Sequence, residues 1–281
     1  MKYDLSIIIS HYCSDENKNP LSKTLESISQ QSSNHNIEII IADDGSGYSG
    51  TITNTYSEKN IIPNDDRSFY IIENDYLNSF LNENNIKTKL IKKWVYLPKL
   101  VKCMSKARVA NEAARIAESD FLLFLDDDNY LIEPNSITNI LNLFNDFDFI
   151  VGQVQDKNGK LRSFSSNRVQ GTTIAIKKTI FNNIKGFGNW TEKYSCGVDS
   201  DFWIKIFNYS QINKQFQACY TDLIKTCDSY SKRWKKYTKF LKEIRLKYQF
   251  YKLYNCKNYK SVKYNLSRNK KMWIENLIIN E

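Results

Sequence analysis

The sequence predicts an α/β fold whose central sheet is mostly parallel and is flanked by helices. Three short apolar runs, 5–9, 37–41 and 121–125, have the composition of strands buried on both faces. Segments with helical spacing of apolar residues separate them, and this alternation is typical of parallel strands joined by crossover helices. With 281 residues, 41% of them hydrophobic, the chain is long enough to bury such a core.

Each further element is predicted from its own pattern. The segment 19–31 places Leu21, Leu25 and Ile28 on one helix face, and Asn158-Gly159 is a strong hairpin turn. Residues 75–100 have a mixed composition that supports no assignment. The expected elements are a helix over 19–31, strands over 37–47 and 69–74, a helix over 105–119, a strand over 121–125, a helix over 135–144, a strand over 147–154, a strand leading into a helix over 171–181, and a helix over 196–207.

Aspartates follow two of the predicted strands at the point where each strand ends. Asp43 and Asp44 follow one, and Asp126, Asp127 and Asp128 follow the other. Carboxyl ends of parallel strands meet at one edge of a sheet, where ligands bind, so we expect the two groups to lie close together. Like charges repel, and more strongly when they are desolvated. A positive partner is therefore expected, which is a side chain, a helix end or a metal ion.

The order of the motifs resembles the family 2 glycosyltransferases, which have the GT-A fold. The motifs are IIIADDGS, an Ala-rich helix with Asn111, FLLFLDDD, FNNIKGFG and VDSDFW, and the likeness covers about residues 4–207. It implies inverting transfer of a sugar from a nucleotide-sugar, expected to be a UDP-sugar, to a growing surface polysaccharide, such as a bacterial capsule, or a lipid-linked glycan. It also implies a GT-A domain over 1–220, with a nucleotide-binding half (1–128) and an acceptor-binding half (129–220). The residues beyond, 221–281, are predicted from their charge and apolar spacing to form a basic helical extension.

The last three aspartates suit a donor that carries a diphosphate. A divalent cation neutralises the charge that develops as a diphosphate leaves, and Mn²⁺ or Mg²⁺ prefers carboxylate and phosphate oxygens. Asp126 and Asp128 form a D-x-D pair, and the resemblance implies that they bind this ion and that Asp126 also contacts the donor. The alternative is an N-cap cluster or a solvated acidic turn.

The resemblance also implies a set of residues for the nucleoside and phosphates. Asp43 or Asp44 would bind the base, with His11 beside it and Asp127 near the ribose. Arg108 would meet the base or a phosphate, although it lies three residues before Asn111, where relatives often have Arg beside the Asn. The alternatives are a plain Asp-Asp-Gly-Ser turn, a half-buried His and a solvated Arg.

The acceptor hydroxyl must lose its proton as it attacks the sugar, which requires a positioned carboxylate. The resemblance implies that Asp199 in CGVDSDFW is this catalytic base, although Val198 stands where the family often has Glu. It places Asp201 and Trp190 weakly on the acceptor side, with Trp190 stacking on a sugar. The alternatives are acidic residues that complement a helix N-terminus, and a core Trp.

Departures from the family pattern keep two rival functions open. The histidine that relatives often add to the metal is missing, since the chain has only His11 and His35, and Asp222, Cys227 or Asp228 are the available substitutes. One rival is a nucleotidyltransferase, although no glycine-rich phosphate loop follows the first strand. The other is an inactive scaffold subunit of a glycan-assembly complex.

The basic charge is concentrated near the C-terminus. Residues 231–271 contain 15 Lys and Arg and one acid, a net charge of +14 against +9 for the whole chain, which leaves −5 for the remainder. One helix face is predicted to carry Trp234, Tyr237, Leu241, Ile244, Tyr248 and Tyr251. Three interpretations stay open: binding to an anionic membrane surface, packing on the domain, and nucleic-acid binding, which is least favoured, so that no nucleic-acid partner is expected.

The cellular location is predicted from absent signals. The sequence has no signal-peptide h-region, no apolar stretch of about 20 residues and no Cys-x-x-Cys pair among its 6 cysteines. We therefore expect a cytoplasmic protein with reduced thiols, peripheral on the inner face of the plasma membrane if the basic segment binds lipid.

Overall fold

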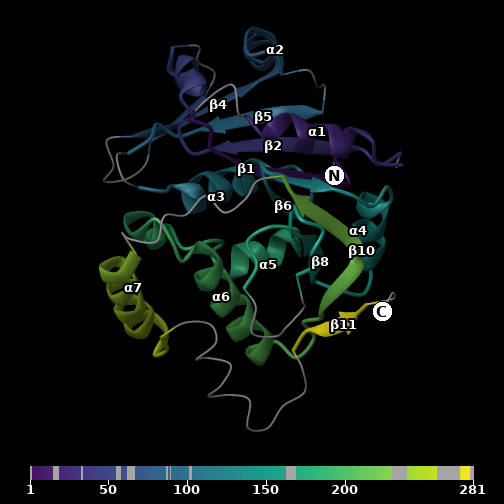
Figure 1. The fold of residues 1–281 in the computed structure, drawn as a ribbon, viewed down its shortest axis with the longest axis vertical. Coiled ribbons are helices and arrows are strands. Elements are labelled where there is room, and N and C mark those ends of the chain that lie inside the picture. Colours follow the sequence, from purple (N-terminus) through teal and green to yellow (C-terminus); the bar gives the residue numbers. More distant parts are fainter. Residues whose placement is uncertain are drawn as a thin grey trace.

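The computed structural model describes residues 2–14, 19–32, 34–54, 58–61, 67–86, 88, 90–100, 103–162, 169–229, 239–257 and 273–278. Within these residues the strands form one eleven-stranded sheet with helices on both faces (Figure 1). The strands are β1 (Leu5–His11), β2 (Ile37–Asp43), β3 (Glu58–Ile61), β4 (Ser68–Glu73), β5 (Ile91–Tyr96), β6 (Phe121–Asp126), β7 (Asn129–Leu131), β8 (Phe149–Gln155), β9 (Ile174–Lys177), β10 (Ala218–Asp228) and β11 (Glu275–Leu277).

The centre of the sheet is parallel and its margins are mixed. The order is β11-β10-β8-β9-β6-β1-β2-β5-β4-β3, with β7 against β10. Strands β6, β1, β2 and β5 run parallel to one another, as do β8, β10 and β11. Strand β9 is antiparallel between β6 and β8, and β3, β4 and β7 also pair antiparallel. The predicted α/β fold with a parallel centre is confirmed.

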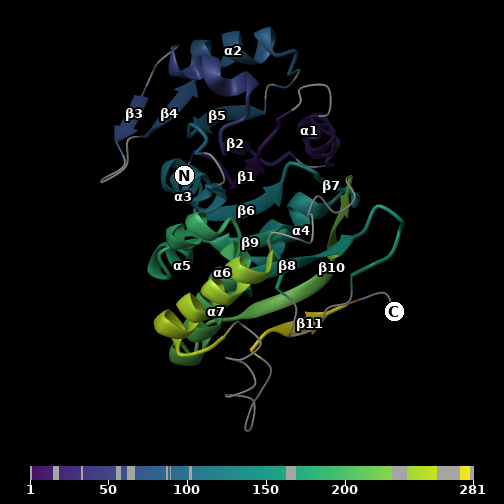
Figure 2. The ribbon, with the colours of Figure 1, turned by 60° about the vertical axis from the view of Figure 1, so that its left-hand side comes forward.

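Two hydrophobic clusters fill the two faces of the sheet, because successive side chains of a strand point to opposite faces. On β6, Leu122 and Phe124 belong to one cluster and Leu123 and Leu125 to the other. The first cluster lies under α3 (Lys106–Ile116), α5 (Lys178–Asn183), α6 (Val198–Ile212) and α7 (Lys239–Tyr254). The second lies under α1 (Leu21–Ser29), α2 (Asn74–Glu83) and α4 (Ser136–Leu143), and Figure 2 shows the layers from a second side.

The elements expected from sequence up to residue 207 are all present, and the tight turn at Asn158-Gly159 is closed by a bridge between Gln155 and Leu161. Five strands of the sheet were not predicted, namely β3, β5, β7, β10 and β11, and two of them show the reason. Strand β5 reads IKKWVY, and its lysines hide the apolar pattern; Lys93 lies 8% exposed and donates to Ile116 O and Glu118. Strand β10 contains polar residues and a register shift between Thr221 and Lys225.

The C-terminal part differs in detail from its expected form. Strand β10 crosses the predicted boundary between residues 220 and 221, so residues 221–228 belong to the sheet. The basic segment contains the helix α7, as expected, while Trp234 and Tyr237 lie outside the described residues. The face predicted to be apolar is exposed at Ile244, Tyr248 and Tyr251, and a different face packs on the domain.

Two expectations concern the chain as a whole. The six cysteines, all within the described residues, form no disulfide with one another, and their reduced state stays a prediction. Among the described residues, no helix combines the length and the apolar character that crossing a bilayer requires. The cytoplasmic location stays a prediction.

Candidate active site

The predicted aspartates meet at the carboxyl edge of the parallel strands. In the sheet register His11 lies opposite Asp43 on β2, and Ser10 lies opposite Asp126 on β6. The two groups of acidic residues therefore flank the end of β1, which stands between β2 and β6 in Figure 1. This confirms that the two groups lie at one edge of the sheet, although more than 80 residues separate them in sequence.

The positive partner of the aspartates is a side chain, Lys106. Helix α3 runs back across the sheet to feed β6, so its first turn lies at the carboxyl edge. There Lys106 Nζ forms an ion pair with Asp126 Oδ1. Burial raises the pKa of Asp126 to about 6, against the opposing effect of Lys106, and the charges of Asp128 and Asp199 raise it further. Burial lowers the pKa of Lys106, but the three carboxylates outweigh it and hold that pKa above its usual value.

Asp127 points the other way, into the protein. Its Oδ2 lies 2.8 Å from His11 Nδ1 and accepts a hydrogen bond from Tyr12 N at 3.2 Å. His11 Nε2 in turn lies 2.6 Å from the Tyr48 hydroxyl. Asp127 and His11 are 4% and 2% exposed. The structure thus places both residues, predicted to contact the donor, in a buried network that braces the end of β1.

Asp43 and Asp44 also differ from each other. Asp43 accepts hydrogen bonds from Ser46 N at 2.8 Å and from Trp94 Nε1 at 3.1 Å, and it is fully buried. Asp44 Oδ2 accepts from Lys99 Nζ at 2.6 Å and from Ser105 N at 2.9 Å. Asp44 Oδ1 is buried and has no hydrogen-bond partner among the described residues. Since buried carboxylate oxygens are normally paired, Asp44 has an acceptor atom to offer a ligand, whereas Asp43 shapes the turn.

Asp199 lies in the first turn of α6, and its charge helps to hold the pKa of Lys106 above its usual value. It is half-buried, and its carboxylate accepts no hydrogen bond from a described residue. A β-carbon at Gly171 would stand 2.3 Å from Asp199 Oδ1, so the carboxylate rests against bare backbone. The next residue, Thr172, accepts a hydrogen bond through Oγ1 from Asp126 N at 3.0 Å. Residues 171 and 172 therefore connect the donor-side aspartate to Asp199.

Asp201, two residues further on, is tied into the packing. It is fully buried and pairs with Lys205 Nζ at 2.9 Å, and it accepts hydrogen bonds from the Tyr254 hydroxyl and from Trp190 Nε1, the latter at 2.8 Å. The ring of Trp190 also contacts Phe250 of α7. The structure thus gives Asp201 and Trp190, both predicted on the acceptor side, a supporting place between α6 and α7.

Arg108 contributes to a second buried network. Its Nε donates to Glu192 Oε2 at 2.5 Å, and Glu192 also pairs with Arg67 at 2.7 Å and accepts from Ser105. Glu192 belongs to the short helix η3 (Asn189–Tyr194), while Arg67 directly precedes β4. The predicted donor-binding Arg108 therefore holds the acceptor-side segment against the donor side.

Asn111 fixes the loop before η3. Its Nδ2 donates to Phe187 O and its Oδ1 accepts from Phe187 N, each at 2.9 Å. Gly186, at φ +52°, has room only for a hydrogen there, since a β-carbon would stand 2.4 Å from Asn111 Oδ1. This loop includes the end of FNNIKGFG, one of the motifs that carry the family resemblance.

Asp126 and Asp128 have the chemistry of ligands for a divalent cation. No group of three or more His, Cys, Asp or Glu residues in the described part of the chain is placed to hold a metal. Two carboxylates, Asp126 and Asp128, share the site, and Mg²⁺ or Mn²⁺ is commonly held by one or two carboxylates plus substrate phosphates and water. Asp228, a substitute considered for the missing His, is bound by Asn129 and Arg162.

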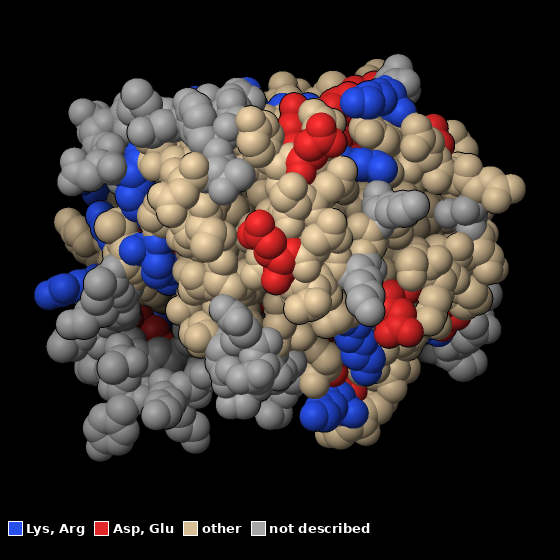
Figure 3. Space-filling view, turned by 90° about the horizontal axis from the view of Figure 1, so that it is seen from above, with Lys and Arg blue, Asp and Glu red and all other residues tan. Residues whose placement is uncertain are grey.

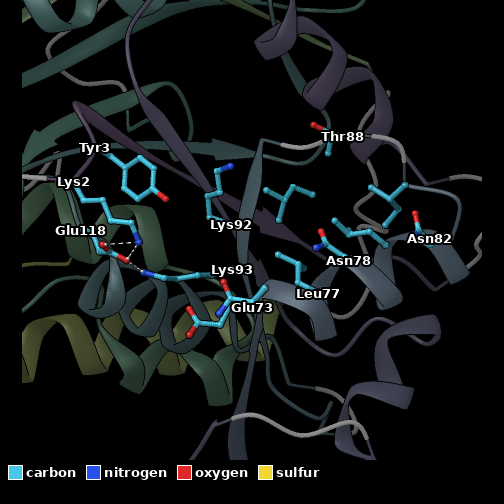
Figure 4. Close-up of a pocket in the computed structure, with 14 residues that line it drawn as sticks. Lys2, Tyr3, Glu73, Leu77, Asn78, Asn82, Thr88, Lys92, Lys93 and Glu118 are labelled. Atoms are coloured by element: carbon cyan, nitrogen blue, oxygen red, sulfur yellow. Dashed lines mark hydrogen bonds and ion pairs between the residues drawn. The ribbon is translucent and has the colours of Figure 1, made fainter.

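A large pocket lies at the opposite end of the sheet. It has a volume of about 800 Å³, and Figure 4 shows Tyr3, Glu73, Asn78 and Lys92 around it. At one side Glu118 pairs with Lys2 and Lys93. Because ligands of parallel sheets bind beyond the carboxyl ends of the strands, this pocket is not the candidate active site.

The sequence did not point to Lys106, to Glu192 or to the contact between Gly171 and Asp199. The position of Lys106 could have been predicted, because the helix that precedes a parallel strand begins at the carboxyl edge of the sheet. Glu192 meets Arg67 across 125 residues of chain, and no local pattern reveals that pairing.

The fold and the acidic carboxyl edge define a class: the chain has the GT-A fold of glycosyltransferases, as its motifs predict. No protein-family model and no curated protein matches the sequence. Among solved structures, TarS from S. aureus (residues 1–349) in complex with UDP-GlcNAc matches at a TM-score of 0.50 and 14% identity, over 83% of this chain and 60% of that one.

The mannosyltransferase PcManGT from Pyrobaculum calidifontis, in complex with GDP-Man and Mn²⁺, matches at a TM-score of 0.52 and 12% identity. The match covers 96% of this chain and 66% of that one, so the chain spans less than two thirds of either structure. At these identities the likeness establishes the fold.

Proposed function

We propose that the chain is a metal-dependent, inverting glycosyltransferase that uses a nucleotide-sugar. The observation that carries the proposal is the convergence of Asp126, Asp128 and Asp199 around Lys106 at the carboxyl edge of the sheet. The two solved structures support it, since one is in complex with UDP-GlcNAc and the other with GDP-Man and Mn²⁺. The donor is proposed to be a UDP-sugar that carries a hexose or N-acetylhexosamine.

The donor side of the site would hold the nucleoside diphosphate. Asp44 Oδ1, a buried oxygen that no described residue bonds, would accept a hydrogen bond from the base. Asp126 and Asp128 would hold Mn²⁺ or Mg²⁺, which supplies the positive charge that stabilises the leaving diphosphate. The ammonium group of Lys106 would then bond a phosphate oxygen as well as Asp126, because a charged donor forms strong hydrogen bonds with phosphate.

Asp199 would act as the catalytic base. It is half-buried, accepts no hydrogen bond from the described part of the chain and faces the same cluster as Asp126, so an acceptor hydroxyl between them could give it a proton. The acceptor oxygen bonds to the anomeric carbon while the bond to the diphosphate oxygen breaks on the opposite side. The nucleoside diphosphate leaves, and the configuration of the sugar inverts.

The acceptor is proposed to be a growing surface polysaccharide or a lipid-linked glycan. The acceptor would approach between helix α6, which carries Asp199, and the loop before η3 that Asn111 fixes. Asp201 and Trp190 stabilise this side from within, and the acceptor itself would contact residues around the Asp199 carboxylate.

The substitution Asp199→Asn tests the base. It should abolish sugar transfer, measured as release of nucleoside diphosphate, and leave nucleotide binding by thermal shift unchanged. The matched control is Asp146→Asn, an exposed aspartate far from the site, which should keep full activity. Transfer that survives in Asp199→Asn at the control rate would refute Asp199 as the base.

A further inference from the structure

Helix α7 has two apolar faces, although a surface helix needs only one to pack. One face carries Leu246, Phe250 and Tyr254, which pack into the core beside α6. The other carries Ile244, Tyr248 and Tyr251, which are 49%, 70% and 56% exposed. At about 100° per residue, these three side chains lie within about 60° of one another, roughly opposite the packed face. Helix α7 runs along the outer edge of the molecule (Figure 1).

The packed face fixes the orientation of the helix. A β-carbon at Gly197 would stand 3.0 Å from the Leu246 side chain, Phe250 contacts Trp190 with ring centroids 5.1 Å apart, and Tyr254 donates to Asp201. Rolling α7 to bury its second face would break these contacts. The exposed face is therefore a fixed feature of this surface.

Cations border the exposed face on both sides. By the same angular spacing, Lys247 lies on one side of it, and Arg245 and Lys252 lie on the other. The surrounding residues 231–271 carry 15 Lys and Arg and one acid. The face of the molecule that carries α2 is different, since its positive and negative side chains are interspersed (Figure 3).

We propose that Ile244, Tyr248 and Tyr251 dock the protein on an anionic membrane surface. An apolar stripe with aromatic residues, bordered by Lys and Arg, is the pattern of a helix that lies in the lipid interface. Each nearby cation adds to the attraction between the protein and anionic lipid. A second copy fits poorly, because pairing two such faces would bring their cations together. A nucleic acid would use the cations and leave Ile244 in water.

The position of α7 connects this surface to the candidate active site. Tyr254 and Phe250 contact Asp201 and Trp190, and Asp201 lies two residues after Asp199. If the proposed function holds, a protein docked by α7 presents its acceptor side to the membrane, where a lipid-linked glycan has its lipid end. The docking itself does not depend on that function.

Vesicle co-sedimentation of the full chain tests the proposal. Vesicles of phosphatidylcholine with phosphatidylglycerol should bind the wild type, and vesicles of phosphatidylcholine alone should bind it at least tenfold more weakly. The double variant Tyr248→Ser/Tyr251→Ser should lose about tenfold in affinity for the anionic vesicles, because two apolar anchors are gone. The matched controls are Tyr76→Ser and Ile212→Ser, which are 50% and 85% exposed elsewhere and should bind as wild type.

Three results would overturn the proposal: binding that ignores lipid charge, a double variant that binds like the controls, or a concentration-dependent dimer in sedimentation velocity that the double variant loses. Thermal stabilisation by nucleotides, measured on the same variants, should be unchanged. Because the vesicle assay needs no donor or acceptor, its failure is separate from a failure of the glycosyltransferase proposal.

Discussion

The carboxylate of Asp199 rests against the α-carbon of Gly171, so closely that a β-carbon at Gly171 would stand 2.3 Å from Oδ1 and 2.5 Å from Oδ2. The neighbouring Thr172 receives the backbone N–H of Asp126 at 3.0 Å. One short segment therefore sets the position of the proposed base relative to the proposed metal and donor ligand. Gly171 is a positioning residue, because it acts through its contact with the proposed base.

The substitution Gly171→Ala should lower kcat about a hundredfold, because a displacement of about 1 Å in a reacting group has that order of effect. Stabilisation by nucleotide diphosphate should be unchanged, since Asp44 and Asp126 stay in place. Gly47→Ala is the matched control, because its β-carbon would meet nothing within 4 Å. Equal kcat values for the two variants would contradict the positioning role.

Lys106→Met should change the binding of Mn²⁺ and of nucleotide diphosphate in opposite directions. Without Lys106 the charges of Asp126 and Asp128 lose their compensating cation, so Mn²⁺ alone should bind more tightly. The diphosphate loses a charged hydrogen-bond donor, and its Kd at saturating Mn²⁺ should rise about tenfold. Isothermal titration calorimetry measures both, with exposed Lys160→Met as control. A diphosphate Kd equal to that of the control would exclude phosphate contact by Lys106.

The pKa of Asp126 predicts how donor binding depends on pH. Burial raises this pKa to about 6, so below that value the carboxyl is protonated and is a poor ligand for a cation. The Mn²⁺-dependent part of nucleotide binding should therefore weaken as the pH falls from 7 to 5. Binding measured without Mn²⁺ is the control and should change less. A Mn²⁺-dependent part that stays constant across this range would argue against Asp126 as a ligand.

Glu192→Gln should destabilise the fold by about 3 kcal/mol, because it leaves Arg67 buried without its carboxylate partner. Burial alone would raise the pKa of Glu192, but hydrogen bonds from Ser105, Arg67 and Arg108 lower it below its usual value. The stability that ionised Glu192 contributes is therefore present at neutral pH and is lost as the pH falls through the acid range of a glutamate. Urea unfolding at pH 7 and at pH 4 measures this.

The difference in the free energy of unfolding between wild type and Glu192→Gln should be smaller at pH 4 than at pH 7. Glu83→Gln, an exposed glutamate on α2, is the control and should unfold like the wild type at both pH values. An equally large difference in unfolding free energy at pH 4 and at pH 7 would show that the ion pairs of Glu192 do not stabilise the fold.

The sequence predicted where the acidic residues lie, but only part of what each one does. Buried parallel strands give continuous apolar runs, so β1, β2 and β6 and their shared edge were visible. The separate roles of Asp126 and Asp127 follow from strand alternation continued past β6: Asp127 lies on the side of Leu123 and Leu125, toward His11 and Tyr48. His11 follows Ile9 on the same side of β1, and that pattern could have placed it inside.

Other features lay beyond any local pattern. Lys93 is an internal strand residue whose amino group reaches the end of α3, so a strand with a lysine in it resembled a loop. The packed face of α7 was predicted wrongly, because this helix carries two apolar faces and each has helical spacing in the sequence. Only the tertiary contacts of Leu246 and Phe250 with the region of Gly197 select between them.

The central proposal is that this edge binds a nucleoside diphosphate with a divalent cation. The most direct test is a thermal-shift panel of UDP, GDP and their sugars, with and without Mn²⁺, on the wild type and on Asp128→Asn. One nucleotide at about a hundred times its Kd should stabilise the wild type by about 2.7 kcal/mol, mainly when Mn²⁺ is present, and Asp128→Asn should lose the Mn²⁺-dependent part. If no nucleotide diphosphate stabilises the wild type in either condition, the glycosyltransferase proposal is wrong.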